Sequence, residues 1–101
     1  MFSLDHISDI LKPILEKHSI YKVIVFGSYA RGYFTSTSDI DLVIDSMGEL
    51  KGISFFIASN EISKMLPIKS DIYEQREIKE GSALHSEILK DGVVIYDRQQ
   101  I

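Results

Sequence analysis

The stretch VIVFGSYARGYFTSTSDIDLVI, residues 23 to 44, organises both the fold and the chemistry of this chain. Its two ends, VIVF and DLVI, are apolar runs rich in β-branched residues, which favour strands. Gly27 and Ser28 follow the first run, and Asp39 and Asp41 begin the second. The polar segment between them predicts a short helical turn after Ser28 and then a loop. The stretch therefore predicts two strands whose connection carries a Gly-Ser turn and a pair of carboxylates.

The two aspartates at the start of the second strand predict a metal site. Residues two apart in an extended chain point to the same side, so Asp39 and Asp41 should present both carboxylates on one face. Two like charges this close are unfavourable without a counter-charge. Mg²⁺ is commonly bound through one or two carboxylates and completes its octahedron with water and substrate phosphate. The alternative reading is a solvated or helix-capping pair with no ligand.

The Gly-Ser turn predicts a phosphate site. Gly27 lacks a side chain, so the backbone can approach a ligand closely. Ser28 offers a hydroxyl, the N–H groups behind it point outward at a helix N-terminus, and Arg31 can add a guanidinium fork. In the alternative reading the turn binds nothing, Ser36 and Ser38 only organise it, and Arg31 forms a structural ion pair with one of the aspartates.

Three apolar patterns predict the longer helices. Apolar residues at spacings of three and four run through residues 4–15, with Ser3 as the N-cap. Pro13 removes one backbone bond there and predicts a kink or a helix that restarts near it. A second helix is predicted over residues 51–66, with an inward stripe of Ile53, Phe56, Ile57, Ile62, Met65 and Leu66. A short third helix precedes Gly92, with its apolar positions at Leu84, Ile88 and Leu89.

Two more strands complete the predicted fold, IKSDIY at residues 68–73 and VVIY at residues 93–96. In the first of these, alternation places Ile68, Ser70 and Ile72 on one face and Lys69, Asp71 and Tyr73 on the other. The order helix, strand, strand, helix, strand, helix, strand suits an α+β, α/β-like domain in which helices flank a small mixed sheet of about four strands. At 101 residues, we expect one domain over residues 1–101.

Composition excludes several classes of function. A net charge of −4 and a pI near 5.2 disfavour contact with a phosphate backbone, so we expect no direct nucleic-acid binding. The chain has no cysteine, which excludes disulfides and thiolate catalysis. It shows neither a signal peptide nor an apolar run long enough to span a bilayer, and we expect a cytoplasmic protein without membrane contact. The histidines His6, His18 and His85 have no metal-ligand spacing and are interpreted as surface or boundary residues.

The motif G-S-x-x-x-G at Gly27 to Gly32, followed by the run SDIDL at residues 38–42, resembles the signature of the DNA polymerase beta-like nucleotidyltransferase superfamily. The short chain and its closing EILKDGVVIYD are most similar to the minimal nucleotidyltransferases, often called the MNT family. Members of that family commonly pair with a HEPN-domain toxin. The resemblance covers nearly the whole chain and implies the nucleotidyltransferase fold.

Carried onto this sequence, the resemblance implies a complete site. The nucleotide-binding candidates are Gly27, Ser28, Arg31 and Ser38. The candidates for both catalysis and metal binding are Asp39, Asp41 and Asp71. In the family the third carboxylate comes from a later strand, where Asp71 matches in position and expected facing, and Glu74 is the fallback if the register of that strand is shifted. A third carboxylate can take the proton from an acceptor hydroxyl and complete a two-metal site.

The resulting hypothesis is an Mg²⁺-dependent nucleotidyltransferase, with two metal ions, that transfers AMP from ATP to an acceptor hydroxyl. By analogy with the family, the acceptor is a tyrosine of a HEPN toxin, and the protein is the antitoxin of a toxin–antitoxin pair. One alternative is a non-catalytic, protein-binding antitoxin on the same fold, although it leaves the clustered aspartates without a purpose. The other is a nucleotidyltransferase for a small, antibiotic-like molecule. Template-directed polymerisation is disfavoured because there is no basic groove.

Overall fold

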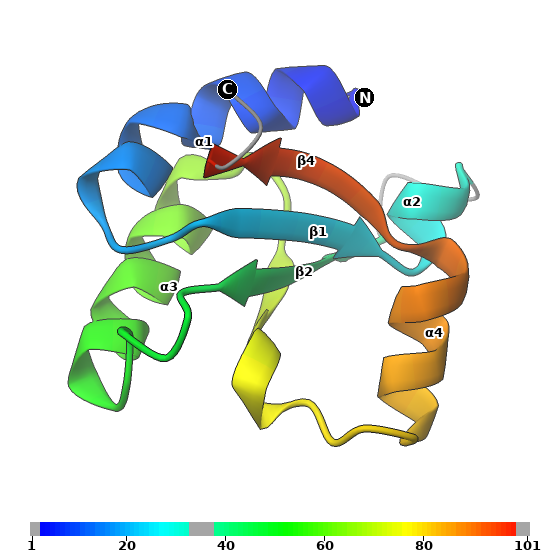
Figure 1. Cartoon of the computed structure of the whole chain (residues 1–101). Coiled ribbons are helices and arrows are strands. Elements are labelled where there is room, and N and C mark those ends of the chain that lie inside the picture. The colour runs from blue at the N-terminus through cyan, green and yellow to red at the C-terminus, as the bar shows by residue number, and fades with distance from the viewer. Residues whose placement is uncertain (1–2, 33–37, 99–101) are drawn as a thin grey trace.

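The computed structural model describes residues 3–32 and 38–98, and these form one mixed sheet with helices on both faces (Figure 1). The strands are β1 (Lys22–Phe26), β2 (Ile40–Asp45), β3 (Ser70–Glu74) and β4 (Val93–Asp97), in the spatial order β3-β2-β1-β4. β1 pairs antiparallel with both β2 and β4, whereas β2 and β3 are parallel. The predicted four-stranded mixed sheet is confirmed.

The helices follow the predicted order, and the structure also contains two single helical turns. The long helices are α1 (Leu4–Lys17), α3 (Ile53–Met65) and α4 (Ala83–Asp91). The single turns are α2 (Ser28–Arg31), which the sequence predicted, and the 3-10 turn η1 (Gln75–Glu77), which it did not. No helix among the described residues has the length and apolar character needed to cross a membrane.

The face of the sheet covered by α1 and α3, here called the closed face, holds the larger core. Ile7, Leu11 and Leu15 of α1 are fully buried against alternate residues of the strands. The hydroxyl of Ser3 accepts a hydrogen bond from the His6 N–H, as an N-cap should. The predicted restart at Pro13 is wrong, because one helix runs through this position to Lys17. Burial of a whole apolar face offsets the loss of one backbone hydrogen bond.

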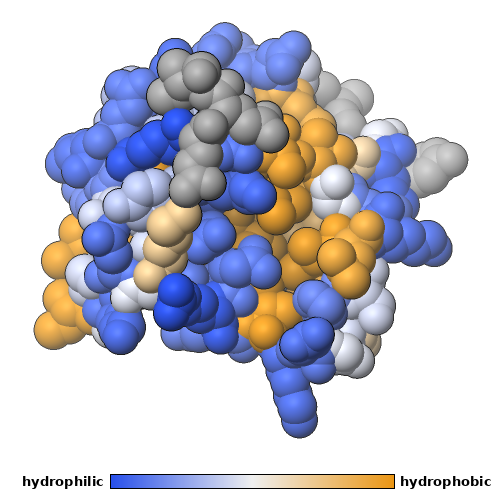
Figure 2. Space-filling model, viewed as in Figure 1, coloured by the Kyte–Doolittle hydropathy of each residue, from blue (hydrophilic) through white to orange (hydrophobic). Residues whose placement is uncertain are grey.

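Helix α3 corrects a second expectation. Ala58 and Ile62 are its fully buried residues, and Leu66 follows them at its end. Four members of the predicted inward stripe face solvent instead, with exposures of 78%, 69%, 48% and 51% for Ile53, Phe56, Ile57 and Met65. Figure 2 shows hydrophobic surface at the lower left, where Figure 1 places the start of α3. The helix carries apolar side chains of its own on several sides, so its sequence periodicity does not mark one buried face. Contacts with α1 and the sheet select the side that is buried.

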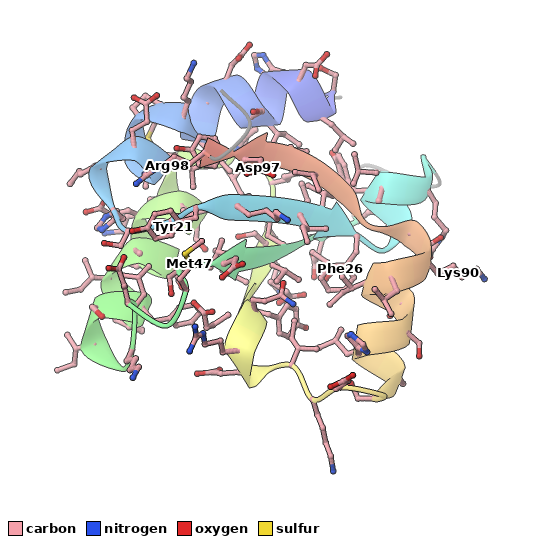
Figure 3. All side chains as sticks on the ribbon, viewed as in Figure 1. Tyr21, Phe26, Met47, Lys90, Asp97 and Arg98 are labelled. Atoms are coloured by element: carbon pink, nitrogen blue, oxygen red, sulfur yellow. The ribbon has the colours of Figure 1, made fainter. Side chains whose placement is uncertain are left out.

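The opposite face of the sheet, here called the α4 face, has a much smaller core. Phe26, Val43 and Ile88 form its buried centre, and Tyr73 packs beside them. The rings of Phe26 and Tyr73 have centroids 5.9 Å apart. Leu89, predicted as an apolar position of this helix, is 74% exposed. In Figure 3, Phe26 lies at the α4 end of the sheet and the labelled Tyr21 and Arg98 lie at the other end.

Candidate active site

The Gly-Ser turn joins β1 to α2 in a backbone conformation that suits glycine. Gly27 has φ +75° and ψ −156°, and its carbonyl accepts a hydrogen bond from the Arg31 N–H at 3.2 Å. A Cβ atom added to Gly27 would overlap Oδ2 of Asp41. The Asp41 carboxylate therefore lies directly against the backbone of the turn. The two halves of the stretch 23–44, the Gly-Ser turn and the aspartate pair, meet at this contact.

Asp41 and Asp71 stand side by side on adjacent strands. Asp41 pairs with Phe26 of β1 on one side and with Asp71 of the parallel strand β3 on the other. Neighbouring strands lie about 4.8 Å apart, and residues in register have side chains on the same face of the sheet. Ile72 packs in the core of the closed face, whereas Tyr73 packs on the α4 face. The predicted facing of Asp71, opposite to Ile72 and together with Tyr73, is confirmed.

Asp39 and Ser38 lie immediately before β2 and are both half-buried. The N–H of Ile40 donates to the carbonyl of Lys69 at 2.9 Å, which ties the beginning of β2 to the beginning of β3. This bond brings Asp39 to the same end of the sheet as Asp41. Ser28, also half-buried, begins α2 beside them. The sequence residues assigned to the site from both halves of the motif therefore gather at one end of the sheet.

This end of the sheet carries a strongly negative field. Burial, followed by the charges of Asp71, Glu87 and Asp39, raises the pKa of Asp41, whereas the charge of Arg31 lowers it. Like charges that share a partly buried site favour the protonated form of each carboxyl in this way. The electrostatic conflict expected from the paired aspartates is therefore present in the folded chain.

Glu87 of α4 is a site neighbour that the sequence did not identify. Its charge acts on Asp41 and also, after burial and the charges of Asp71 and Asp41, raises the pKa of the Tyr73 phenol. In the sequence, Glu87 is one of several charges on an amphipathic helix. Only the packing of α4 against β1 and β2 places it near the aspartates.

Arg31 forms its ion pairs with α4. Its Nη1 lies 3.0 Å from Oδ2 of Asp91 and 4.0 Å from Oε1 of Glu87. Among the residues that the structure describes, these are the carboxylates that pair with Arg31. The structural ion pair that the alternative reading placed at Asp39 or Asp41 therefore forms with α4 instead. Arg31 thus links the Gly-Ser turn to α4.

Glu74, the fallback for the third carboxylate, has a structural role. It is 3% exposed and accepts hydrogen bonds from the Ser46 hydroxyl at 2.7 Å and from the Arg76 N–H at 3.2 Å. It pairs with Ile44, three positions along the strands from the pairing of Asp41 with Asp71. The register of β3 therefore favours Asp71 as the residue beside Asp41.

The chemistry of this group of residues fits a hard divalent cation. Carboxylate oxygens are ligands that Mg²⁺ prefers, and the absent side chain at Gly27 leaves room for phosphate to complete the coordination. Asp41 and Asp71 would hold such an ion, with Asp39 next to them. Within residues 3–32 and 38–98, however, no three acidic or histidine side chains converge into a finished metal site. Two carboxylates with water and phosphate would be needed to complete one.

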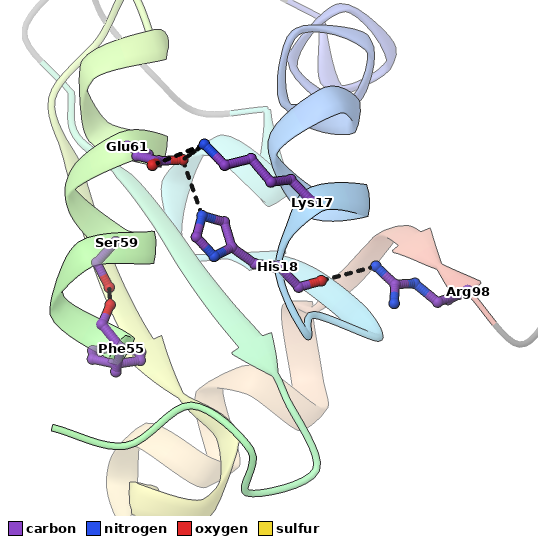
Figure 4. A network of polar contacts seen from close by, with 6 residues as sticks. All are labelled: Lys17, His18, Phe55, Ser59, Glu61 and Arg98. Atoms are coloured by element: carbon purple, nitrogen blue, oxygen red, sulfur yellow. Dashed lines mark hydrogen bonds and ion pairs between the residues drawn. The ribbon is translucent and has the colours of Figure 1, made fainter. Parts of the chain in front are cut away.

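Other polar groups lie away from this end. Nε2 of His18 is 2.9 Å from a carboxylate oxygen of Glu61, which also pairs with Lys17, in a network that joins α1 to α3 (Figure 4). Arg98 donates to the carbonyl of His18 at 3.1 Å in the same network. A surface hollow of about 470 Å³ lies between α1 and β4, and none of the candidate site residues lines it. We place the candidate chemistry at the aspartates.

Comparisons with known proteins identify the family. Residues 9–101 match the family model described as polymerase beta, nucleotidyltransferase. A proposed protein adenylyltransferase of Methanocaldococcus jannaschii is 35% identical over 82 residues, which cover 77% of this chain and 84% of the relative.

Two solved structures share the fold. A crystal structure of a toxin–antitoxin with AMP-PNP superposes with a TM-score of 0.74 at 20% identity, covering 92% of this chain and 75% of that chain. A tri-AMPylated Shewanella oneidensis HEPN toxin in complex with an MNT antitoxin gives a TM-score of 0.69 at 17% identity, covering 96% and 75%. The resemblance found in the sequence is thus confirmed, and the chain is a nucleotidyltransferase that belongs to the polymerase beta family.

Proposed function

We propose that this chain transfers AMP from ATP to a protein hydroxyl, a tyrosine of a HEPN-domain toxin, and thereby acts as an antitoxin. The observation that carries the proposal is the contact of Asp41 with the backbone of Gly27 while it stands in register with Asp71. This contact sets carboxylates next to a turn suited to phosphate. The relative named as a protein adenylyltransferase and the neighbours crystallised with AMP-PNP or as an AMPylated toxin support the choice of donor and acceptor.

In this proposal the turn binds the triphosphate. The first N–H groups of a helical turn have no acceptor within the helix and attract anions. Gly27 lets the backbone approach the phosphates, and Ser28 and Ser38 offer hydroxyl groups at the same end of the sheet. Arg31, exposed at the end of α2, supplies a positive charge that would attract the phosphates in a site otherwise lined by aspartates.

Asp39, Asp41 and Asp71 would hold Mg²⁺ together with the phosphates of the bound nucleotide. When bound, the ions neutralise charge on the triphosphate and on the oxygens of the in-line displacement. Asp71, exposed on edge strand β3, would accept the proton from the acceptor hydroxyl at its carboxylate oxygen. The acceptor oxygen forms a bond to the α-phosphorus, the bond from that phosphorus to the β-phosphate oxygen breaks, and pyrophosphate leaves.

The acceptor and the compartment follow from this chemistry. An acidic chain of net charge −4 suits a basic, nucleic-acid-cleaving partner, because complementary charge steers association. We propose the cytoplasm as the site of the reaction, since it supplies ATP and Mg²⁺. A non-catalytic antitoxin on the same fold is the competing hypothesis, and the exposed apolar residues of α3 are the observation that favours it.

Intact-mass spectrometry tests the proposal. The HEPN-domain protein that copurifies with this chain, or is encoded beside it, is incubated with ATP, Mg²⁺ and either the wild-type chain or Asp39→Asn/Asp41→Asn. We expect the toxin to gain one or more AMP units with wild type only. Asp5→Asn/Asp9→Asn, which removes the same charge from the first half of α1, should transfer AMP normally. A stable complex with no mass gain, and toxin neutralised equally by both proteins, would contradict catalysis and favour the binding antitoxin.

A further inference from the structure

The ion pair between Arg31 and Asp91 connects the Gly-Ser turn to the end of α4. The Arg31 Nη1 donates to Asp91 Oδ2 at 3.0 Å, and Glu87 lies 4.0 Å from the same nitrogen. The Asp91 side chain is 14% exposed, compared with 39% for Arg31. A charge-assisted hydrogen bond with one partner largely shielded from water is stronger than an exposed ion pair.

The local electrostatics of α4 do not explain why position 91 carries a carboxylate. It is the last residue of α4, where the helix dipole disfavours a carboxylate and favours a cation. Its neighbour Lys90, in the same last turn, points away from the body of the molecule in Figure 3. Glu87, one turn earlier, adds a second carboxylate 4.0 Å from the Arg31 Nη1. Both carboxylates are therefore placed at an electrostatic cost that Arg31 offsets.

We propose that Asp91, assisted by Glu87, is a positioning residue that holds the Arg31 guanidinium at the Gly-Ser turn. There the guanidinium meets the triphosphate of the nucleotide. This inference rests on the proposed nucleotide site. A guanidinium carries five N–H donors in a fixed plane, so Nη1 can stay on Asp91 while other donors reach a phosphate oxygen. The Arg31 N–H donates to the Gly27 carbonyl at 3.2 Å, so the residue that carries the held guanidinium is itself part of the turn.

A double-mutant cycle tests the proposal through binding alone. The affinity for AMP-PNP with Mg²⁺ is measured by isothermal titration calorimetry for wild type, Asp91→Asn, Arg31→Ala and the double variant. We expect Asp91→Asn to weaken binding about fivefold and Arg31→Ala about tenfold or more. If Asp91 acts through Arg31, adding Asp91→Asn to Arg31→Ala should change nothing further. Asp91→Glu, which keeps the charge, should recover part of the affinity.

Three further measurements separate positioning from general structure. In the transfer reaction, Asp91→Asn should raise KM for ATP more than it lowers kcat. Glu61→Gln breaks the other inter-helix pair, with Lys17, and should leave AMP-PNP affinity unchanged. Glu87→Gln gives a second route to the same answer if Asp91→Asn unfolds, with a smaller loss of affinity that also vanishes in the Arg31→Ala background.

The outcomes are distinguishable. Wild-type chain that binds AMP-PNP, together with unchanged affinity in folded Asp91→Asn, would overturn the positioning role and leave the proposed function standing. Losses that add in the double variant would also overturn it, because Asp91 would then act independently of Arg31. Wild-type chain that binds no AMP-PNP would overturn the proposed function and this inference together.

Discussion

The two faces of the sheet are built by the same strands for opposite purposes. On the closed face, Ile40, Leu42 and Ile44 of β2 are fully buried beneath α1 and α3. On the α4 face the same strand presents Asp41 and Val43, and the apolar centre there is small. Alternation along one strand thus sends every second residue into a stable core and the residues between them toward the candidate site. Stability and chemistry are therefore assigned to the two opposite faces of one sheet.

The difference also shows how an unfavourable site is tolerated. Burial, followed by repulsion from the clustered carboxylates at one end of the α4 face, raises the pKa of Asp41. The closed face contributes fully buried side chains from α1, α3 and the two strands β1 and β2, and their burial offsets that repulsion. Substitutions on the two faces should therefore have opposite signatures, one in activity and the other in stability.

The largest expected effect is on activity, at Asp41. Asp41→Asn should lower AMP transfer roughly a thousandfold, because a positioned charge in a site of this kind is worth that much in rate. Its free energy of unfolding should not fall, since the substitution removes repulsion with Asp71, Glu87 and Asp39. Radiolabelled AMP transfer and urea unfolding would measure the two quantities. A variant that loses stability as well as activity would show that Asp41 supports the fold.

Two isoleucines compare the cores directly. Ile44→Ala on the closed face should cost about 4 kcal/mol of unfolding free energy, because Ile44 is fully buried in the larger core. Ile88→Ala on the α4 face should cost about 2 kcal/mol, since Ile88 is 7% exposed in a smaller cluster that can relax. Both values come from urea unfolding. Equal costs would contradict the view that the closed face carries most of the stability.

Two glycines separate backbone strain from contact with the site. Gly27→Ala combines a positive φ with overlap against Asp41, so we expect a loss of about 2–3 kcal/mol and weakened AMP-PNP binding. Gly81→Ala has a similar φ of +81° but meets no atom within 4 Å, and should cost about 1 kcal/mol with normal binding. Chemical unfolding with parallel calorimetry checks both. Identical losses in the two variants would mean that Asp41 moves aside freely.

The pH dependence of stability should differ between wild type and Asp41→Asn. The pKa of Asp41 is raised in the folded chain, so the folded state binds this proton more tightly than the unfolded state. The contribution of Asp41 to the free energy of unfolding therefore becomes more favourable as the pH falls from the raised pKa of the folded chain toward the unfolded value of about 3.9. We expect the stability advantage of Asp41→Asn to be present at pH 7 and to shrink across that window. An advantage that grows toward acid would refute the sign.

The smallest effect is expected on the outer surface of α3. Phe56 is 69% exposed, so Phe56→Ser should change the free energy of unfolding by less than about 0.5 kcal/mol and leave AMP-PNP binding intact. Thermal unfolding of the isolated chain measures the first quantity. Phe55→Ser is the matched control, because Phe55 packs against the core of the closed face and its replacement should be clearly destabilising.

Local sequence patterns predicted most of this fold for identifiable reasons. The β-branched runs, Ser3 as an N-cap and Gly27 at the end of β1 each act over a few residues, so they can be read without tertiary contacts. The pattern of α3 misled because apolar residues surround the helix and no periodicity marks the buried side. The helix does not restart at Pro13 because the packing of α1 outweighs one missing hydrogen bond.

The sequence by itself determined the family, the order of the strands and helices, and the opposite facing of Ile72 and Asp71, because signature spacing and alternation are local properties of the chain. Only the tertiary structure decided that Asp41 touches the Gly27 backbone, that Asp71 is its partner in register, and that Arg31 pairs with α4. Those contacts join segments tens of residues apart. Strand pairing and helix packing, not any local preference, bring them together.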